Sequence, residues 1–90
     1  MRYTTGTRSF VDRFASLAEI VAPEVELMLP QAEMTKAEVV RMGSRLGVPL
    51  ERTYSCMRGR ARHCGSCLQC RSRRAAFIDA GVEEAADFYD

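Results

Sequence analysis

The stretch CMRGRARHCGSCLQC, residues 56–70, holds all four cysteines of the chain, with seven, two and two residues between successive thiols. Two residues between thiolates allow a tight turn that directs both sulfurs at one tetrahedral ion, and Cys64-Gly65-Ser66-Cys67 has this form. A disulfide framework fits less well, because Cys64, Cys67 and Cys70 lie within two helical turns of one another. The spacing therefore predicts a metal site formed by Cys56, Cys64, Cys67 and Cys70.

Zinc is the ion that this ligand set favours. Four thiolates complete a tetrahedral shell and leave no open position, so we predict one structural Zn²⁺ per chain rather than a catalytic one. An iron–sulfur cluster is the alternative that the run C-x2-C-x2-C raises, although the long gap after Cys56 and the lack of a proline after Cys70 are not of the ferredoxin type. His63 could replace one sulfur, but four cysteines already fill the shell, so we expect His63 to be exposed.

The length of the chain makes such a metal important for stability. Ninety residues form one domain at most, and a chain of this size buries only about 60–65% of its unfolded surface. Structural zinc contributes on the order of 10 kcal/mol to folding, which is comparable with the whole stability of a small domain.

Apolar runs are short and residues 1–6 lack a signal-peptide core, so we expect a cytoplasmic protein with no membrane partner.

Arginines surround the cysteines without any acidic residue between Cys56 and Arg74. Four thiolates on a divalent ion carry about −2, which these arginines would offset. Two interpretations stay open, namely charge balance with a solvated surface, or a face for an anion or nucleic acid. The six arginines are Arg58, Arg60, Arg62, Arg71, Arg73 and Arg74.

Hydrophobic periodicity predicts a helix and a strand in the first third of the chain. Apolar residues recur on one helical face of about a dozen residues, which Ser9 with Asp12 would cap. The alternating segment 25–29 predicts a short strand that ends at a proline. One strand cannot form a sheet, so these residues belong to a larger α/β domain or dock onto another chain. The apolar face consists of Phe10, Phe14, Leu17 and Val21.

Two further helices are predicted downstream. Thr35 and Glu38 form a capping box at the start of the second helix, and Gly47 ends it. The third helix spans Leu68 to Ala80 and ends at Gly81, and we expect the acidic residues 83–87 to fray.

No Ser-His-Asp, paired-carboxylate or Cys-His nucleophile arrangement is supported, so catalytic residues stay unassigned.

These motifs together resemble the C-terminal part of the ExsB/QueC family of 7-cyano-7-deazaguanine synthases, which act in queuosine biosynthesis. The resemblance covers residues 8 to 84. It rests on the segments TKAEVVRMG (35–43), LGVP (46–49), Ser55-Cys56, Cys64-Gly65-x-Cys67-x2-Cys70-x2-Arg73, Phe77 and Ala80-Gly81-Val82.

The resemblance implies a fold, a reaction and cofactors. The fold is an α/β adenine-nucleotide α-hydrolase-like (pyrophosphate-loop ATPase) domain, here mostly helical with one short strand and a four-cysteine zinc segment. The family uses ATP with Mg²⁺ to adenylylate the carboxylate of 7-carboxy-7-deazaguanine, a small-molecule 7-deazaguanine substrate, and converts it with ammonia to the nitrile. The family's zinc ligands map onto Cys56, Cys64, Cys67 and Cys70.

Lys36 is the one candidate for ATP binding that the resemblance provides. A lysine in the first turn of a helix is unfavourable beside the positive end of the helix dipole, whereas the free amides there favour phosphate. In related ligases a lysine at this position resembles a phosphate contact, and the alternative is a simple solvent-facing lysine.

The chain departs from the family in two respects: it contains no glycine-serine-rich loop of the type SGGxDS, and the segment 8–14 lacks the family's usual acidic residue before the Phe. We therefore expect residues 1–90 to be a single partial domain that is inactive alone, with a helix–strand–helix segment at 8–49 and a zinc-binding segment at 50–84. A chain that supplies the nucleotide-binding half, or a homodimer partner, would complete it. The alternative is a stand-alone zinc module that binds nucleic acid or protein through its arginines, and of these nucleic acid is the less expected partner.

Overall fold

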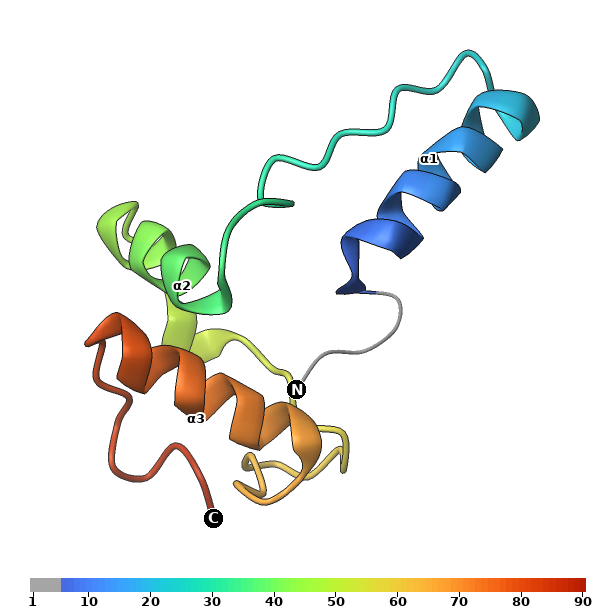
Figure 1. The fold of residues 1–90 in the computed structure, drawn as a ribbon. Coiled ribbons are helices and arrows are strands. Elements are labelled where there is room, and N and C mark those ends of the chain that lie inside the picture. Colours follow the sequence, from blue (N-terminus) through green and yellow to red (C-terminus); the bar gives the residue numbers. More distant parts are fainter. Residues whose placement is uncertain (1–5) are drawn as a thin grey trace. The chain divides into compact units, whose positions relative to one another are not determined.

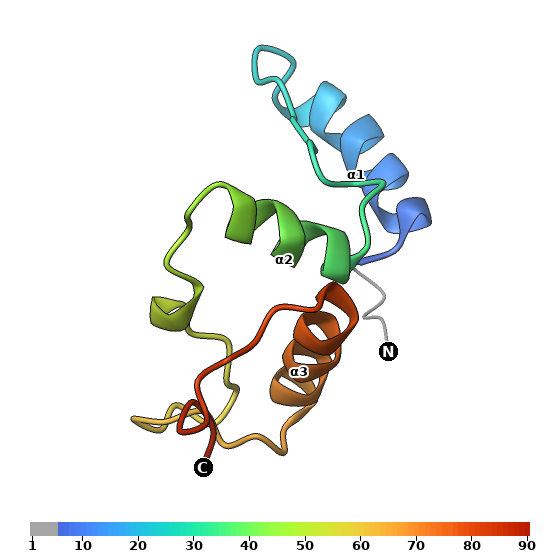
Figure 2. The same cartoon turned by 90° about the vertical axis from the view of Figure 1, so that its left-hand side faces the viewer.

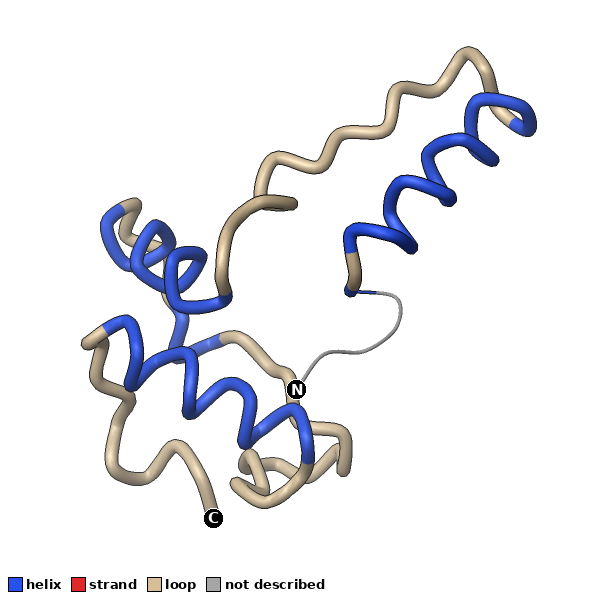
Figure 3. The backbone as a smooth tube through the Cα atoms, viewed as in Figure 1, coloured by secondary structure: helices blue, strands red, loops and turns tan. Residues whose placement is uncertain are grey.

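The structure is a computed structural model, and it describes residues 6–90. These residues form three α-helices and a short 3-10 helix (Figures 1 and 3), namely α1 (Arg8–Val21), α2 (Lys36–Arg45), η2 (Leu50–Arg52) and α3 (Leu68–Ala80). The chain divides into two compact units, Met1–Glu33 and Met34–Asp90. Within the described residues, no helix is long and apolar enough to cross a membrane. That the 90 residues form one partial domain stays a prediction, and the first five lie outside the described part.

The first unit consists of α1 and an irregular segment after it. Thr7 begins the helix, because its extended backbone leaves the hydroxyl free to accept a hydrogen bond from Phe10 N at 3.2 Å. The predicted cap at Ser9 is therefore wrong, since Ser9 already lies within the helix. Arg8 pairs with Asp12 one turn along the helix at 3.0 Å and also contacts Glu33.

The predicted apolar face of α1 forms and is exposed. Phe10 and Phe14 stack with their ring centroids 6.0 Å apart, and Phe14 and Leu17 are 48% and 57% exposed. No residue of α1 is buried. Within its own unit the helix thus presents an exposed amphipathic surface.

The predicted strand at residues 25–29 is wrong. This segment has no strand pairing, and no strand ladder forms anywhere in residues 6–90. The physical reason is that an extended segment becomes a strand only when a neighbour accepts and donates its backbone hydrogen bonds. Of the expected fold class, the mostly helical character is confirmed and the single strand is not.

The second unit begins with α2, whose boundaries agree with the sequence prediction. Thr35 Oγ1 accepts a hydrogen bond from Glu38 N at 3.2 Å, and Thr35 N donates to Glu38 Oε1 at 3.2 Å, so the predicted capping box is confirmed. Gly47 follows the helix with a φ of 75°, a conformation that favours glycine. The helix packs against α3 (Figure 2) and buries Ala37.

The third predicted helix is confirmed at both ends. α3 begins after Cys67, whose side chain accepts a hydrogen bond from Cys70 N at 3.4 Å, and it ends at Gly81, whose φ is 70°. The residues that α3 buries are Cys70, Ala76 and Phe77. One end of the helix therefore belongs to the cysteine cluster, and its middle packs toward the rest of the second unit.

Candidate metal centre

The four cysteines come together in the second unit. Their sulfur atoms all lie within 4.8 Å of one another, and the Cys64 and Cys70 sulfurs are 3.9 Å apart. A tetrahedral ion with zinc–sulfur bonds of about 2.3 Å separates its sulfurs by about 3.8 Å. Cys70 is fully buried, Cys56 and Cys64 are buried, and Cys67 is half-buried. The cysteines are thus positioned to hold a single metal ion.

Three short pieces of chain place these side chains. Cys56 follows the extended residues after η2, Cys64 and Cys67 flank a turn, and Cys70 lies in the first turn of α3. The turn depends on Gly65, which has a φ of 77°. A side chain at this position would also approach Tyr89 Cβ to 3.3 Å, so both the backbone conformation and the space require glycine.

Backbone N–H groups point at the sulfurs. Cys64 Sγ accepts from Ser66 N at 3.4 Å and from Cys67 N at 3.2 Å. Cys56 Sγ accepts in the same way from Arg58 N at 3.4 Å and from Cys64 N at 3.5 Å. Such donors stabilise negative charge on sulfur, which four thiolates around a divalent ion would carry.

The electrostatics of the cluster favour a bound cation. The N–H groups of Ser66 and Cys67, Ser66 foremost, lower the pKa of the Cys64 thiol to about 5. The pKa of Cys67 is also lowered, mainly by the backbone of Met57. Burial instead raises the pKa of Cys70 to about 12. A divalent ion would supply the positive charge that Cys70 needs to ionise, because a coordinating thiol is deprotonated.

The geometry favours one ion over a cluster of several irons. Each thiolate of a four-iron cluster binds a different iron, so its cysteines are held farther apart than those around a single ion. Four sulfurs within 4.8 Å of one another instead match a mononuclear tetrahedral site.

His63 is buried, which makes the predicted exposure wrong. Its side chain is 5% exposed and lies between Tyr54 and Phe88, with ring centroids 4.6 and 4.3 Å away. Nε2 accepts a hydrogen bond from Ser55 N at 3.1 Å, so the imidazole holds the chain beside the first cysteine. Burial, together with the nearby Arg73 cation, lowers the pKa of His63 and keeps the ring neutral. His63 is therefore a packing residue beside the four sulfurs.

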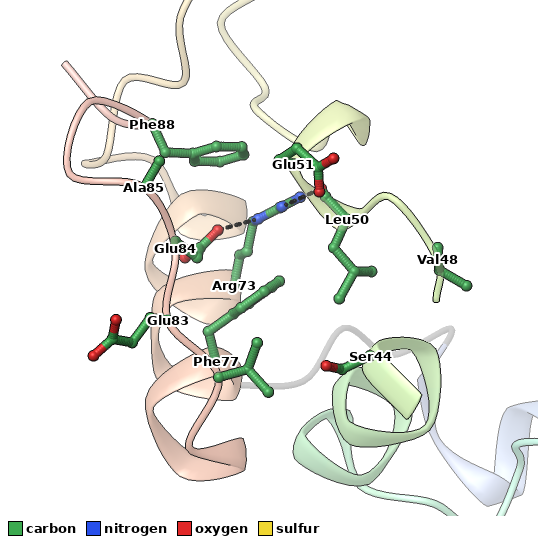
Figure 4. Close-up of a pocket in the computed structure, with 11 residues that line it drawn as sticks. Ser44, Val48, Leu50, Glu51, Arg73, Phe77, Glu83, Glu84, Ala85 and Phe88 are labelled. Atoms are coloured by element: carbon green, nitrogen blue, oxygen red, sulfur yellow. Dashed lines mark hydrogen bonds and ion pairs between the residues drawn. The ribbon is translucent and has the colours of Figure 1, made fainter. Parts of the chain in front are cut away.

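Arg73 has a role that neither interpretation of the arginines anticipated. Its side chain is only 10% exposed and pairs through Nε with Glu84 Oε2 at 2.8 Å. Nη1 donates to Thr53 Oγ1 at 2.8 Å and Nη2 to Leu50 O at 2.9 Å. Figure 4 shows the guanidinium between Glu84 and Leu50, with the Phe88 ring beside it. Arg73 thus ties α3 to η2 and to the C-terminal residues.

Glu84 and Tyr89 complete this arrangement and correct the expectation that the acidic residues fray. The Tyr89 hydroxyl donates to Glu84 Oε1 at 2.6 Å. Burial raises the pKa of Tyr89, followed by its bond to Glu84, so the hydroxyl stays protonated. The only sequence signal for this was a carboxylate and two aromatic residues close together at the end of the chain.

The remaining arginines do not act as one group. Arg60 and Arg62 face Asp90 at 3.7 and 4.0 Å, and Arg74 lies over the Tyr89 ring at 4.7 Å. Arg58 and Arg71 are exposed. A nucleic-acid face would have to form without Arg73.

Lys36 is the exposed first residue of α2. Lys36 is not among the residues that the structure places together as a possible metal site. Its role in ATP binding stays a prediction.

A small cavity of about 170 Å³ lies beside Arg73 (Figure 4). Leu50, Phe77, Phe88 and Ser44 are among its lining residues. Sites for small molecules usually measure about 300–1,000 Å³, so the volume of this cavity is below the usual range.

Comparison with known proteins adds to this geometry. The family model described as queuosine biosynthesis protein QueC matches residues 2–81. The chain is 46% identical over 74 residues to the 7-cyano-7-deazaguanine synthase of Archaeoglobus fulgidus, covering 82% of this chain and 30% of that protein. It is 38% identical over 87 residues to the synthase of Methanothermobacter thermautotrophicus, covering 96% and 39%, respectively. The chain thus spans between 30% and 39% of the length of these curated relatives. No solved structure matches significantly.

Proposed function

Because this chain belongs to the QueC family of queuosine biosynthesis proteins, we propose that it forms the zinc-binding, C-terminal part of a 7-cyano-7-deazaguanine synthase. The observation that carries the proposal is the set of four sulfurs within 4.8 Å of one another, in a segment that the family model covers. The whole synthase would use ATP to convert 7-carboxy-7-deazaguanine and ammonia to 7-cyano-7-deazaguanine in the cytoplasm.

The role proposed for zinc is structural. The ion would be held by Cys56, Cys64, Cys67 and Cys70. It would cross-link segments of the chain that bury few other hydrophobic residues. In the described residues the buried hydrophobic set consists of three of these cysteines with Ala37, Ala76 and Phe77. Without an ion, so small a core gives little stability.

The nucleotide site is proposed to lie largely in the family's pyrophosphate-loop region, within an adenine-nucleotide α-hydrolase-like fold. Lys36, at the exposed start of α2, would contact a phosphate of ATP bound with Mg²⁺. The exposed apolar face of α1 would pack against that region, whether it lies on the same or another polypeptide, or against a homodimer partner. Residues 1–90 alone would not catalyse the reaction.

Metal analysis tests the proposal directly. The protein purified without added metal is expected to contain one zinc per chain by inductively coupled plasma mass spectrometry, because four thiolates bind zinc tightly at neutral pH. Alkylating the cysteines after unfolding, and then refolding, should give a control sample without zinc. Iron in place of zinc, or no metal in the untreated sample, would contradict the proposed site.

Calorimetry with ATP and Mg²⁺ tests the part proposed for Lys36. The chain alone is expected to show no binding of ATP. When the region of a curated relative that carries the pyrophosphate loop is added, we expect ATP binding to be detected. Lys36→Ala should then weaken binding by roughly ten- to a hundredfold, because a charge-assisted contact to phosphate contributes about 1.5–3 kcal/mol. Arg41→Ala, an exposed change on the same helix, is the matched control. Equal affinities in the two variants would remove Lys36 from the site.

A further inference from the structure

The last residues of the chain return from α3 to the cysteine cluster. Figure 2 shows this segment, in red, running from the end of α3 back toward the loop before the helix. We call residues 82–90 the strap. Its last part lies beside His63, with which Tyr89 forms a parallel backbone bridge.

The strap is fastened along its length. Val82 N donates to Phe77 O at 3.1 Å at its start, and Asp90 N donates to His63 O at 2.7 Å at its end. Between these points Glu84 forms an ion pair with Arg73 that is largely shielded from solvent. The segment is therefore a bound part of the second unit rather than a free terminus.

Tyr89 brings the strap into contact with the metal centre. Its side chain packs against the cluster that the buried Cys56, Cys64 and Cys70 form. Its Cβ and ring lie so close to Gly65, in the turn between two of the cysteines, that a methyl group there would be 3.3 Å from Tyr89. Phe88, the residue before Tyr89 in the strap, stacks on His63 with a centroid separation of 4.3 Å.

This covering has a consequence for how a metal could leave. A chelator must reach the ion or a sulfur before it can replace a thiolate, and Cys70 is fully buried. Tyr89 packs against the cysteine cluster and lies beside the turn that joins Cys64 to the half-buried Cys67. Access from that side requires the strap to open locally, which costs the contacts of its aromatic residues.

We infer that the strap closes one side of the metal centre and limits the rate at which the metal exchanges. Tyr89 is the strap residue that holds this side closed, because it packs against the cysteine cluster. The inference rests on the proposed binding of zinc. It concerns release kinetics, so a weakened strap can speed metal loss while the stoichiometry at equilibrium stays at one ion per chain.

The test follows zinc release from the full chain to an excess of the chromophoric chelator 4-(2-pyridylazo)resorcinol. Tyr89→Ala is expected to release zinc at least roughly tenfold faster than the unchanged protein, because the strap loses a largely apolar contact that must be broken to open. Asp87→Ala is the matched control, since Asp87 is an exposed residue of the same strap. It should release zinc at the unchanged rate.

Metal content is measured first in each sample. If Tyr89→Ala holds less than one zinc, Tyr89→Leu, which keeps an apolar side chain, takes its place, and faster release from it supports the strap. Release at the unchanged rate from a fully loaded Tyr89 variant would overturn the inference while leaving the metal site intact. An unchanged protein without zinc would instead overturn the proposed function, and the strap's role with it.

Discussion

Replacing Cys67 with serine is expected to abolish metal binding and to unfold the second unit, Met34–Asp90. The change removes one of four ligands, and structural zinc contributes on the order of 10 kcal/mol to folding. A small domain has a total stability of about 5–15 kcal/mol, so this loss is comparable with the whole. Metal content by mass spectrometry and the helical signal of α2 and α3 by circular dichroism measure the two effects.

Serine makes this substitution unusually specific. Cys67 is the N-cap of α3, with extended backbone dihedrals and a side chain that accepts from Cys70 N. Serine is among the best N-cap residues, so Cys67→Ser retains the cap and removes only the sulfur ligand. A loss of structure therefore reports on the metal rather than on the start of the helix.

The control for Cys67→Ser is Ser66→Ala in the same turn. Ser66 is exposed, and alanine retains its backbone N–H bond to Cys64 Sγ and loses only the hydroxyl bond to the same sulfur at 3.6 Å. We expect one zinc per chain and a loss of stability of about 1 kcal/mol or less. If Cys67→Ser also kept one zinc and melted like the unchanged protein, the four-thiolate site would be wrong.

Arg73→Ala is expected to lower the free energy of unfolding of the metal-loaded protein by about 3–5 kcal/mol. The substitution leaves the Glu84 carboxylate, whose side chain is 11% exposed, without its cation. It also removes the bonds to Thr53 Oγ1 and Leu50 O and the stacking on Phe77 and Phe88. Urea unfolding followed by circular dichroism measures the loss.

Two further variants separate charge from shape at Arg73. Arg73→Lys keeps the charge but lacks the planar fork that reaches three acceptors, so we expect it to recover only part of the stability. Each of the changes Arg73→Met and Glu84→Gln leaves one charge without its partner, whereas the double variant leaves neither. The double variant should therefore be less destabilised than the sum of the two single variants, by about 1 kcal/mol or more.

Arg71→Ala is the matched control for Arg73→Ala, since Arg71 is an exposed arginine two residues earlier on the same helix. Its expected change is within about 0.5 kcal/mol. Equal stability of the Arg71 and Arg73 variants would mean that the interactions around Glu84 contribute nothing beyond those of a surface arginine.

The cluster of four cysteines was predictable because its signal is local. A two-residue gap between Cys64 and Cys67, and again between Cys67 and Cys70, limits how far apart the sulfurs can lie. The ends of α2 and α3 were predictable for a similar reason. A capping box and a glycine with positive φ are formed by residues within a few positions of one another.

The strand at 25–29 and the exposure of His63 were predicted wrongly because neither is a local property. A β-prone segment becomes a strand only beside a partner, and none pairs with it among residues 6–90. His63 is buried in part by Phe88, which lies 25 residues later in the sequence (88 − 63). Residue type and spacing carry no information about such a neighbour.

The sequence by itself thus determined that the four cysteines come together, that the second unit has two capped helices and that α1 is amphipathic. Only the tertiary structure decided which arginine is structural. Arg71, Arg73 and Arg74 are arginines within one turn of the same helix. Of the three, only Arg73 bonds to Glu84, 11 residues later, and to the Leu50 carbonyl, 23 residues earlier. The physical reason is that burial of a charge depends on groups that the fold brings together from distant parts of the chain.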